Sequence, residues 1–184
     1  MGSVSRRTAL RIIGGNILLA ILYVGLILLI MARHTTHRFD KLIELSATKY
    51  DVDPRLVWAV IWQESRFNPR SVGTKNEVGL MQIMETAGRE WADAAGRPHF
   101  RREDLFDPAT NIEAGTWYLA RAIERWSACD DPIPFALAEY NAGRSNALRW
   151  YAASGPDGRR FIECITYPTT RKYIESILRN FRDE

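Results

Sequence analysis

Histidine and cysteine, the side chains that most often bind transition metals, are scarce in this chain of 184 residues. Two of the three histidines, His34 and His37, flank a hydrophobic segment near the N-terminus, so only His99 remains for the rest of the chain. Zinc sites usually require three or four ligands, and Cys129 and Cys164 form no C-x-x-C motif. We therefore predict no metal site and no cofactor, and a Cys–His catalytic pair is disfavoured.

Acidic residues are absent from residues 1–38, which hold five of the 25 basic side chains. The remaining residues carry 20 basic and 22 acidic side chains, a net charge of −2, so the formal charge of +3 arises at the N-terminus. A protein that binds nucleic acid usually carries a basic patch or stripe on its folded domain. We therefore expect no nucleic acid partner.

The one long hydrophobic run covers residues 12–32, in which Asn16 is the only strongly polar residue. A helix of this length spans roughly 30 Å, the thickness of a bilayer core. The alternative is a cleaved signal peptide, but Ile30 is bulky where a cleavage site needs a small residue. We expect an uncleaved transmembrane helix and a short spacer within residues 1–38, followed by one domain over residues 39–184.

The basic residues before this run favour a cytoplasmic N-terminus, with the domain on the far side of the membrane. Arg6, Arg7 and Arg11 precede the run. Outside the cytoplasm a disulfide between Cys129 and Cys164 is allowed, and the sequence leaves open whether it forms.

Alternating strand patterns and internal repeats are absent from residues 39–184, whereas helical patterns bounded by turn residues are frequent. The domain is therefore predicted to be all-α or nearly so. We expect helices at residues 39–50, from 54 to about 67, and at 85–95, 107–126, 135–140, 145–152 and 170–181.

Tryptophan rings can stack on sugars, but tryptophans within apolar helices are expected in the core. Trp58, Trp62 and Trp117 belong to such helices. The sequence assigns no environment to the other three tryptophans, Trp91, Trp126 and Trp150.

Glu64 continues the apolar face of its own predicted helix. Val57, Val60, Ile61 and Glu64 follow the spacing i, i+3, i+4 and i+7, which places them on one helix face. Because apolar surroundings disfavour the charged form, the pKa of such a carboxyl rises, as a general acid near neutral pH requires. The alternative is that Glu64 lies one turn beyond the buried part and faces water.

Five short motifs follow one another along the domain: ESRFNP at 64–69, GLMQIM at 79–84, NIEAG at 111–115, AEYNAG at 138–143 and TRKYI at 170–174. Together they resemble the lytic transglycosylase (SLT) domain, a lysozyme-like fold that acts on peptidoglycan. The resemblance covers about residues 41–181. It implies a bacterial enzyme that cleaves the bond between N-acetylmuramic acid and N-acetylglucosamine without water and leaves 1,6-anhydro ends.

The resemblance also implies roles for the matching residues. Glu64 matches the single catalytic acid, which protonates the glycosidic oxygen and then removes the proton of the muramic acid 6-hydroxyl. Residues that match substrate-binding positions are Ser65, Met81, Gln82, Met84, Tyr140, Asn141 and Tyr173. Thr169 stands where a glutamate is common in the family, and Gly73 stands where a serine is common.

With the hydrophobic run, the resemblance places the protein in the bacterial inner membrane, with a single span and the catalytic domain on the periplasmic side. Glycan strands would be its substrate, and a membrane-bound envelope assembly that needs a local gap in the wall is a possible partner.

Two alternatives remain open. A hydrolytic muramidase usually needs a second carboxylate, for which Glu77, Glu85, Glu113 and Glu139 are candidates by their position in the sequence. A catalytically silent scaffold that binds peptidoglycan is the other alternative, although the intact motif residues argue against it.

Overall fold

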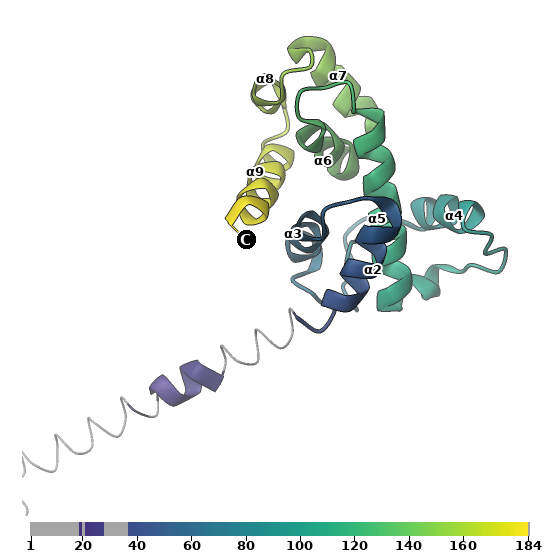
Figure 1. Cartoon of the computed structure of the whole chain (residues 1–184), viewed down its shortest axis with the longest axis vertical. Helices are drawn as coiled ribbons and strands as arrows, with labels where there is room; N and C mark the ends of the chain where they lie inside the picture. The colour runs from purple at the N-terminus through teal and green to yellow at the C-terminus, as the bar shows by residue number, and fades with distance from the viewer. Residues whose placement is uncertain (1–18, 20, 28–36, 184) are drawn as a thin grey trace, which may run out of the picture. The chain divides into compact units, whose positions relative to one another are not determined.

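The computed structural model describes residues 19, 21–27 and 37–183. The chain divides into two compact units, Met1–Arg38 and Phe39–Glu184, and Figure 1 shows the helices of the second. Each unit is described by itself.

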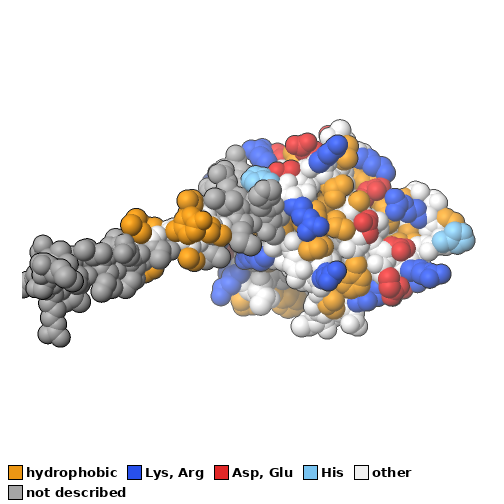
Figure 2. Space-filling model, turned by 90° about the horizontal axis from the view of Figure 1, so that it is seen from below, with side chains coloured by type: hydrophobic (Ala, Val, Ile, Leu, Met, Phe, Trp, Pro, Cys, Tyr) orange, Lys and Arg blue, Asp and Glu red, His pale blue; other side chains and the backbone are white. Residues whose placement is uncertain are grey.

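Within the first unit, residues 21–27 are helical, and their apolar side chains are exposed (Figure 2), with Ile21, Leu22 and Tyr23 between 61% and 65% exposed. Most of the predicted span at residues 12–32 lies outside the described residues. Among the residues that are described, no helix has both the length and the apolar character needed to cross a membrane.

The second unit is helical, which confirms the all-α prediction for the described part of the chain. Only two isolated bridges, Val72 with Val78 and Val78 with Ile83, have strand geometry there. The elements are α2 (Asp40–Tyr50), α3 (Pro54–Ser65), α4 (Glu85–Ala94), the 3₁₀ turn η1 (Arg102–Phe106), α5 (Pro108–Arg125), α6 (Pro132–Ala142), α7 (Arg144–Ser154), α8 (Gly158–Cys164) and α9 (Pro168–Asp183).

The long helix α5 forms the centre of this unit (Figure 1). It packs against α2, α4, η1 and α6, whereas α3 packs between α2 and α9. Helix α6 in turn contacts α7, α8 and α9. The C-terminal helix α9 therefore closes the unit by packing against both α3 and α6.

Aspartate–proline pairs open three of these helices. Asp53 accepts a hydrogen bond from the Arg55 backbone N–H at 2.9 Å, and Asp107 accepts one from Thr110 N–H at 2.9 Å. A third aspartate, Asp131, caps α6 in the same way. Each aspartate accepts a hydrogen bond from a backbone N–H that has no partner within the helix. The proline that follows has no backbone N–H of its own, so it leaves no donor unpaired.

Helix α3 was expected to run to about residue 67, but it ends at Ser65. Arg66 and Phe67 both take the left-handed conformation, with φ of 52° and 61°, and Arg66 N–H closes the helix on Trp62 O at 3.2 Å. The chain therefore reverses one residue after Ser65 and folds back beside Glu64.

The tryptophan prediction is wrong in detail. The three tryptophans that the sequence left unassigned, Trp91, Trp126 and Trp150, are buried, with at most 6% of each exposed. Trp58, Trp62 and Trp117 are only partly buried and pack around the edge of the core. Trp58 and Trp62 stack on each other, with ring centroids 5.8 Å apart.

Candidate active site

Glu64 lies in the last turn of α3, where the apolar face of the helix ends. Val57, Val60 and Ile61 on the same face have no exposed surface, and Glu64 itself is partly buried. Burial raises the pKa of Glu64 from its ordinary value of 4.5 to about 7, because a carboxylate loses hydration when it leaves water. The prediction of a carboxyl held against apolar surface is confirmed, and the alternative that Glu64 simply faces water is wrong.

Two neighbours act on Glu64 in opposite directions. The Tyr173 hydroxyl, from α9, donates a hydrogen bond to Glu64 Oε1 at 2.6 Å. This bond favours the carboxylate and lowers the pKa of Glu64, whereas the negative charge of Glu77 raises it. The pKa near 7 is therefore the balance of burial and these two groups.

Tyr140 brings α6 to the same place. Its hydroxyl donates to the backbone carbonyl of Met81 at 2.9 Å. Burial and the charge of Glu64 raise the pKa of Tyr140 and of Tyr173 well above the usual 10. Both phenols therefore stay protonated at neutral pH and act as hydrogen-bond donors beside Glu64.

The segment between α3 and α4 forms one wall of the site, and side chains fix its backbone. The Ser65 hydroxyl donates to Leu80 O at 2.8 Å. The Gln82 amide nitrogen donates to Gly79 O at 2.8 Å, while Gln82 itself takes a left-handed φ of 49°. Ser65 and Gln82 therefore use their polar groups to shape the wall, and their predicted contacts with substrate stay predictions.

Met81 and Met84 lie in different surroundings, although both belong to the GLMQIM motif. Met81 is fully buried, whereas Met84 is 46% exposed at the start of α4. A glycan contact by the Met81 side chain would require that side chain to be uncovered, while Met84 is accessible as the wall stands.

Asn111, on α5, anchors this wall to the core, a role that the sequence alone did not assign. Its amide nitrogen donates to Val78 O and to Leu105 O, both at 2.8 Å. Its oxygen accepts from Met81 N–H at 2.7 Å. The signals in the sequence were its place at the start of the NIEAG motif and its position beside Ile112 on an otherwise apolar helix face.

Of the four carboxylates suggested as partners of Glu64, three are paired elsewhere. Glu85 pairs with Arg89 at 2.6 Å, and Glu113 with Lys49 at 2.6 Å. Glu139 pairs with Arg125 and accepts from the Trp126 indole at 2.8 Å. The fourth, Glu77, is the one whose negative charge raises the pKa of Glu64.

Asn141 lies one residue beyond Tyr140 and is exposed. The Thr170 hydroxyl donates to its side-chain oxygen at 2.8 Å, which leaves the amide NH₂ group directed away from that bond. Asn141, Thr169 and Tyr173 all line a groove of about 530 Å³ between the end of α3 and α9.

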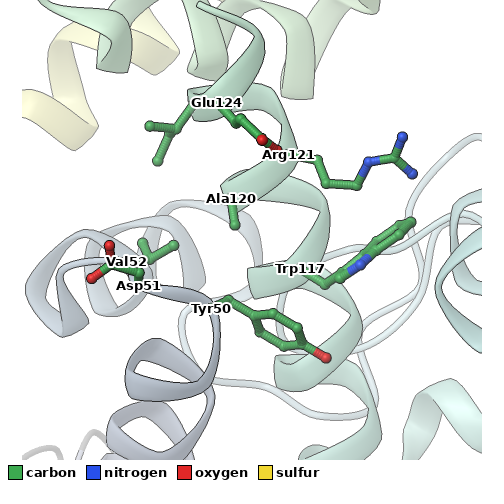
Figure 3. Close-up of a pocket in the computed structure, with 8 residues that line it drawn as sticks. Tyr50, Asp51, Val52, Trp117, Ala120, Arg121 and Glu124 are labelled. Atoms are coloured by element: carbon green, nitrogen blue, oxygen red, sulfur yellow. The ribbon is translucent and has the colours of Figure 1, made fainter. Parts of the chain in front are cut away.

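A second hollow, of about 480 Å³, lies between α2 and α5. Figure 3 shows Tyr50 and Trp117 projecting into it from these two helices, and the Arg121 guanidinium lies 4.8 Å from the Trp117 ring centre. None of the residues that surround Glu64 lines this hollow, so it is separate from the candidate active site.

The two cysteines are free and partly buried. Over residues 37–183 and the described part of the first unit, no cluster of three or more His, Cys, Asp or Glu residues could hold a metal ion.

A search of known protein families matches the transglycosylase SLT domain to residues 41–160. The chain belongs to the transglycosylase SLT domain family. The family predicted from the five motifs is thus confirmed. Tyr173 lies on α9, beyond the matched residues, but its hydroxyl binds the glutamate of the first motif.

Solved structures resemble this SLT domain closely in fold. The 70-kDa soluble lytic transglycosylase of Escherichia coli matches with a TM-score of 0.70 and 28% identity, over 80% of this chain and 25% of that one. A complex of the 70-kDa soluble lytic transglycosylase with bulgecin A matches with a TM-score of 0.71 and 27% identity. That match covers 79% of this chain and 24% of the other. An inactive mutant of the lytic transglycosylase Slt from Pseudomonas aeruginosa shares the fold, with a TM-score of 0.70 and 24% identity. That match covers 77% of this chain and 23% of Slt. The chain thus spans about a quarter of the length of these proteins.

Two departures of this SLT domain from common family residues lie beside the site. A Cβ atom at Gly73 would lie 2.5 Å from Glu77 Cδ and 2.8 Å from Gln82 Oε1, so a serine there would displace Glu77. Gly73 therefore leaves room for the carboxylate that acts on Glu64. Thr169 is exposed at the groove and adds no charge to it.

Proposed function

We propose that this protein is a membrane-anchored lytic transglycosylase that cleaves peptidoglycan between N-acetylmuramic acid and N-acetylglucosamine. Family membership and the likeness to lytic transglycosylases support the reaction class. The observation that carries the mechanism is Glu64, a single carboxyl with a pKa of about 7 and a hydrogen bond from Tyr173. A group that serves as acid and then as base works best when its pKa lies near the operating pH.

In the first half of the proposed reaction, Glu64 gives its proton to the glycosidic oxygen as the bond to the anomeric carbon breaks. The N-acetylglucosamine side leaves with a new hydroxyl. The acetamido group of the substrate stabilises the electron-poor anomeric carbon from within the sugar. Tyr173 stabilises the Glu64 carboxylate that forms, because a hydrogen bond to the charged form favours it.

In the second half, the Glu64 carboxylate takes the proton from the 6-hydroxyl of the same muramic acid residue. The freed oxygen bonds to the anomeric carbon and closes the 1,6-anhydro ring. Glu64 is protonated again, so the enzyme returns to its starting state and no water is consumed.

A hydrolytic muramidase is the second candidate, and one observation favours keeping it. Glu77 is the only one of the four suggested carboxylates whose charge acts on Glu64, so it could direct a water molecule toward the anomeric carbon. Two-carboxylate glycosidases hold their acids about 5–9.5 Å apart, according to mechanism. The products separate the two candidates, since hydrolysis leaves reducing ends and transglycosylation leaves anhydro ends.

The decisive experiment is mass spectrometry of purified sacculi digested with the full chain in detergent. We expect muropeptides with 1,6-anhydro-muramic acid ends, lighter by one water than reducing ends. E64Q should abolish their release, while E44Q, which neutralises an exposed glutamate on α2, should leave it unchanged. Reducing ends from the native protein would establish the muramidase instead. Release that survives in E64Q would exclude Glu64 as the acid.

We also propose that residues 12–32 anchor the protein in the bacterial inner membrane, with the second unit on the periplasmic side. The uncharged composition of this run and the exposed apolar side chains at residues 21–27 support this. A spacer of about six residues reaches only on the order of 20 Å, so cleavage would be confined to wall near the membrane. Cleavage at this short reach would open a local gap in the wall for a membrane-bound envelope assembly.

The anchor is tested by fractionation and protease treatment of spheroplasts. We expect the full chain in the membrane fraction, resistant to alkaline carbonate, with the second unit digested by external protease. A chain recovered in the soluble fraction would exclude the anchor and leave the proposed reaction intact.

A further inference from the structure

The second hollow, between α2 and α5, is formed by one face of α5 and the end of α2. Trp117, Ala120, Arg121 and Glu124 line it, at the spacing i, i+3, i+4 and i+7 of a single helix face. Tyr50 projects into it from α2 (Figure 3). Ala120 has the smallest side chain of this face and leaves the hollow open. Its volume of about 480 Å³ lies within the range of about 300–1,000 Å³ that small-ligand sites occupy.

The Tyr50 ring is held in place from outside the hollow. Its hydroxyl donates a hydrogen bond to Glu113 Oε1 at 3.1 Å and accepts one from the Trp91 indole N–H at 3.4 Å. Neither Glu113 nor Trp91 lines the hollow. The ring is therefore oriented before any ligand arrives, which reduces the entropy that binding costs.

Trp117 offers a free hydrogen-bond donor to the same hollow. Trp91, Trp126 and Trp150 each donate their indole N–H to another side chain, whereas Trp117 forms no such bond within the described residues. Trp117 is also only partly buried. An aromatic ring of this kind presents an apolar face together with a polar group.

The charges around the hollow favour a neutral ligand. Asp51, Arg121 and Glu124 line it and are exposed, and none of them forms an ion pair in the described part of the chain. Two carboxylates against one guanidinium repel an anion. The Arg121 guanidinium lies 4.8 Å from the Trp117 ring centre, where it takes the place that a cationic ligand would occupy.

We propose that the second hollow binds N-acetylglucosamine units of the glycan strand, at a site separate from the one that cuts the strand. The apolar faces of a sugar ring would pack on Tyr50 and Trp117. Its hydroxyl and acetamido groups would bond to Arg121, Glu124 and the Trp117 indole N–H. The choice of this polymer rests on the proposed function. A folded protein fits less well, because a stable protein interface takes about 20–30 residues a side and eight line the hollow.

Helix α5 carries this hollow and a part of the active site on different faces. Tyr118, the residue after Trp117, packs against Tyr140 with ring centroids 5.7 Å apart. With 3.6 residues in each turn of a helix, neighbouring side chains point in different directions. A strand held in the hollow would raise the local concentration of the same polymer at Glu64.

The test follows the NMR signal of the Trp117 indole N–H in the full chain with E64Q, in detergent. The probe is a neutral tetramer of β-1,4-linked N-acetylglucosamine, and W117F identifies the signal by its disappearance. We expect the signal to shift and to saturate as the probe is added. A120L should prevent the shift because it fills the hollow. A153L, the same change at an exposed position of α7, should not prevent it.

A second variant, R121A/E124A, removes two charged groups of the hollow and keeps the net charge. We expect it to weaken binding of the probe at the hollow by about 5- to 30-fold, the loss of one or two hydrogen bonds to charged groups. R160A/E163A makes the same change at the same spacing on exposed positions of α8 and should keep the native affinity. Salt should have little effect, because screening acts on pairs of charges and the probe has none.

A Trp117 signal that does not shift, or a shift that persists in A120L, would overturn the inference. So would equal losses of affinity in R121A/E124A and R160A/E163A, or an affinity that falls steeply with salt. A saturable shift together with no anhydro product from the native protein would overturn the proposed reaction and leave the binding site standing. Anhydro product without any shift would leave the reaction standing and overturn the binding site.

Discussion

Two residues act on the pKa of Glu64 in opposite directions, Tyr173 by hydrogen bonding and Glu77 by charge. A carboxyl with an ordinary pKa would be ionised at neutral pH and unable to donate a proton. A carboxyl with a much higher pKa could not act as the base in the second half of the reaction. Changes to either neighbour should therefore appear first in the pH dependence of the rate.

Replacing Glu77 by glutamine removes the repulsive charge and should lower the pKa of Glu64. The alkaline limb of the kcat/KM profile should then move to lower pH, because the protonated acid is lost earlier. The measurement is the pH profile of anhydro-end release. E85Q, which breaks only the pair with Arg89, should leave the limb in place. If the alkaline limb does not move in E77Q, Glu77 does not act on the pKa of Glu64. If the native protein releases reducing ends and E77Q does not, the result favours the muramidase.

Replacing Tyr173 by phenylalanine should move the same limb in the opposite direction. The hydroxyl at 2.6 Å favours the carboxylate, so its loss raises the pKa of Glu64. A hydrogen bond to a charged group contributes about 1.5–3 kcal/mol, so kcat/KM should fall about 10- to 150-fold if that bond supports the reaction. A shift toward lower pH, or an unchanged rate, would contradict this role. Y167F, at an exposed position before α9, is the control.

For single residues, the sequence predicts features that depend on one helix well, and contacts between distant parts of the chain poorly. The burial of Glu64 could be predicted because Val57, Val60 and Ile61 precede it on the same helix face. The contact between Tyr173 and Glu64 could be expected only from the resemblance of the motifs, because no local pattern in the sequence predicts that two distant helices meet. The Gln63 side-chain oxygen is buried without a hydrogen-bond partner among the described residues, a result of packing that the sequence did not predict.

The element that depends most on one distant side chain is the wall between α3 and α4. Asn111 pairs with Val78, Leu105 and Met81 from within the core. N111L keeps the number and branching of the side-chain heavy atoms but leaves three backbone groups unpaired. Each such group costs about 1–3 kcal/mol, partly relieved by relaxation, so we expect a loss of about 2–4 kcal/mol in the free energy of unfolding.

Urea denaturation measures this loss, and anhydro-end release reports on the wall. N111L should lose activity even under conditions in which it is fully folded, because Ser65 and Gln82 bind the displaced backbone. N180L, at a partly exposed position of α9, should change stability by less than about 0.5 kcal/mol. Equal stability of N111L and the native protein would show that the three bonds do not hold the wall.

Helix starts were predicted unevenly, since α6 begins at Pro132 and not at residue 135 as expected. The aspartate–proline pairs at the starts of α3 and α5 are local signals, and both helices begin where these pairs indicate. The end of α3 depends on left-handed backbone at Arg66 and Phe67. Packing imposes this conformation, and the sequence has no glycine there that would have predicted it. Helix α8 has only seven residues, too few to show a repeating apolar pattern, and was missed.

For the molecule as a whole, the raised pKa of Glu64 makes stability depend on pH. The folded state holds the proton up to a pH of about 7, whereas the unfolded chain releases it near 4.5. Ionisation therefore destabilises the fold progressively as the pH rises from 4.5 to about 7. One pKa unit corresponds to about 1.36 kcal/mol, so the full effect reaches about 1–3 kcal/mol for this partly exposed group.

E64Q removes this penalty because the amide does not ionise. We expect the variant to exceed the native protein in free energy of unfolding by about 1–3 kcal/mol near pH 8, with the difference vanishing near pH 4. Urea titrations across this range measure it, and E44Q should show no such trend. A constant difference at every pH would mean that the ionisation of Glu64 is not coupled to folding.

The bond between Tyr173 and Glu64 joins residues that lie 109 positions apart. A ribosome makes the chain from its N-terminus, so α3 is synthesised well before α9. Until α9 has been made and packed onto α3, no hydroxyl reaches Glu64 and the groove lacks one wall. A nascent chain therefore carries its acid without the partner that completes it, and the proposed activity requires that α9 has been made and has packed onto α3.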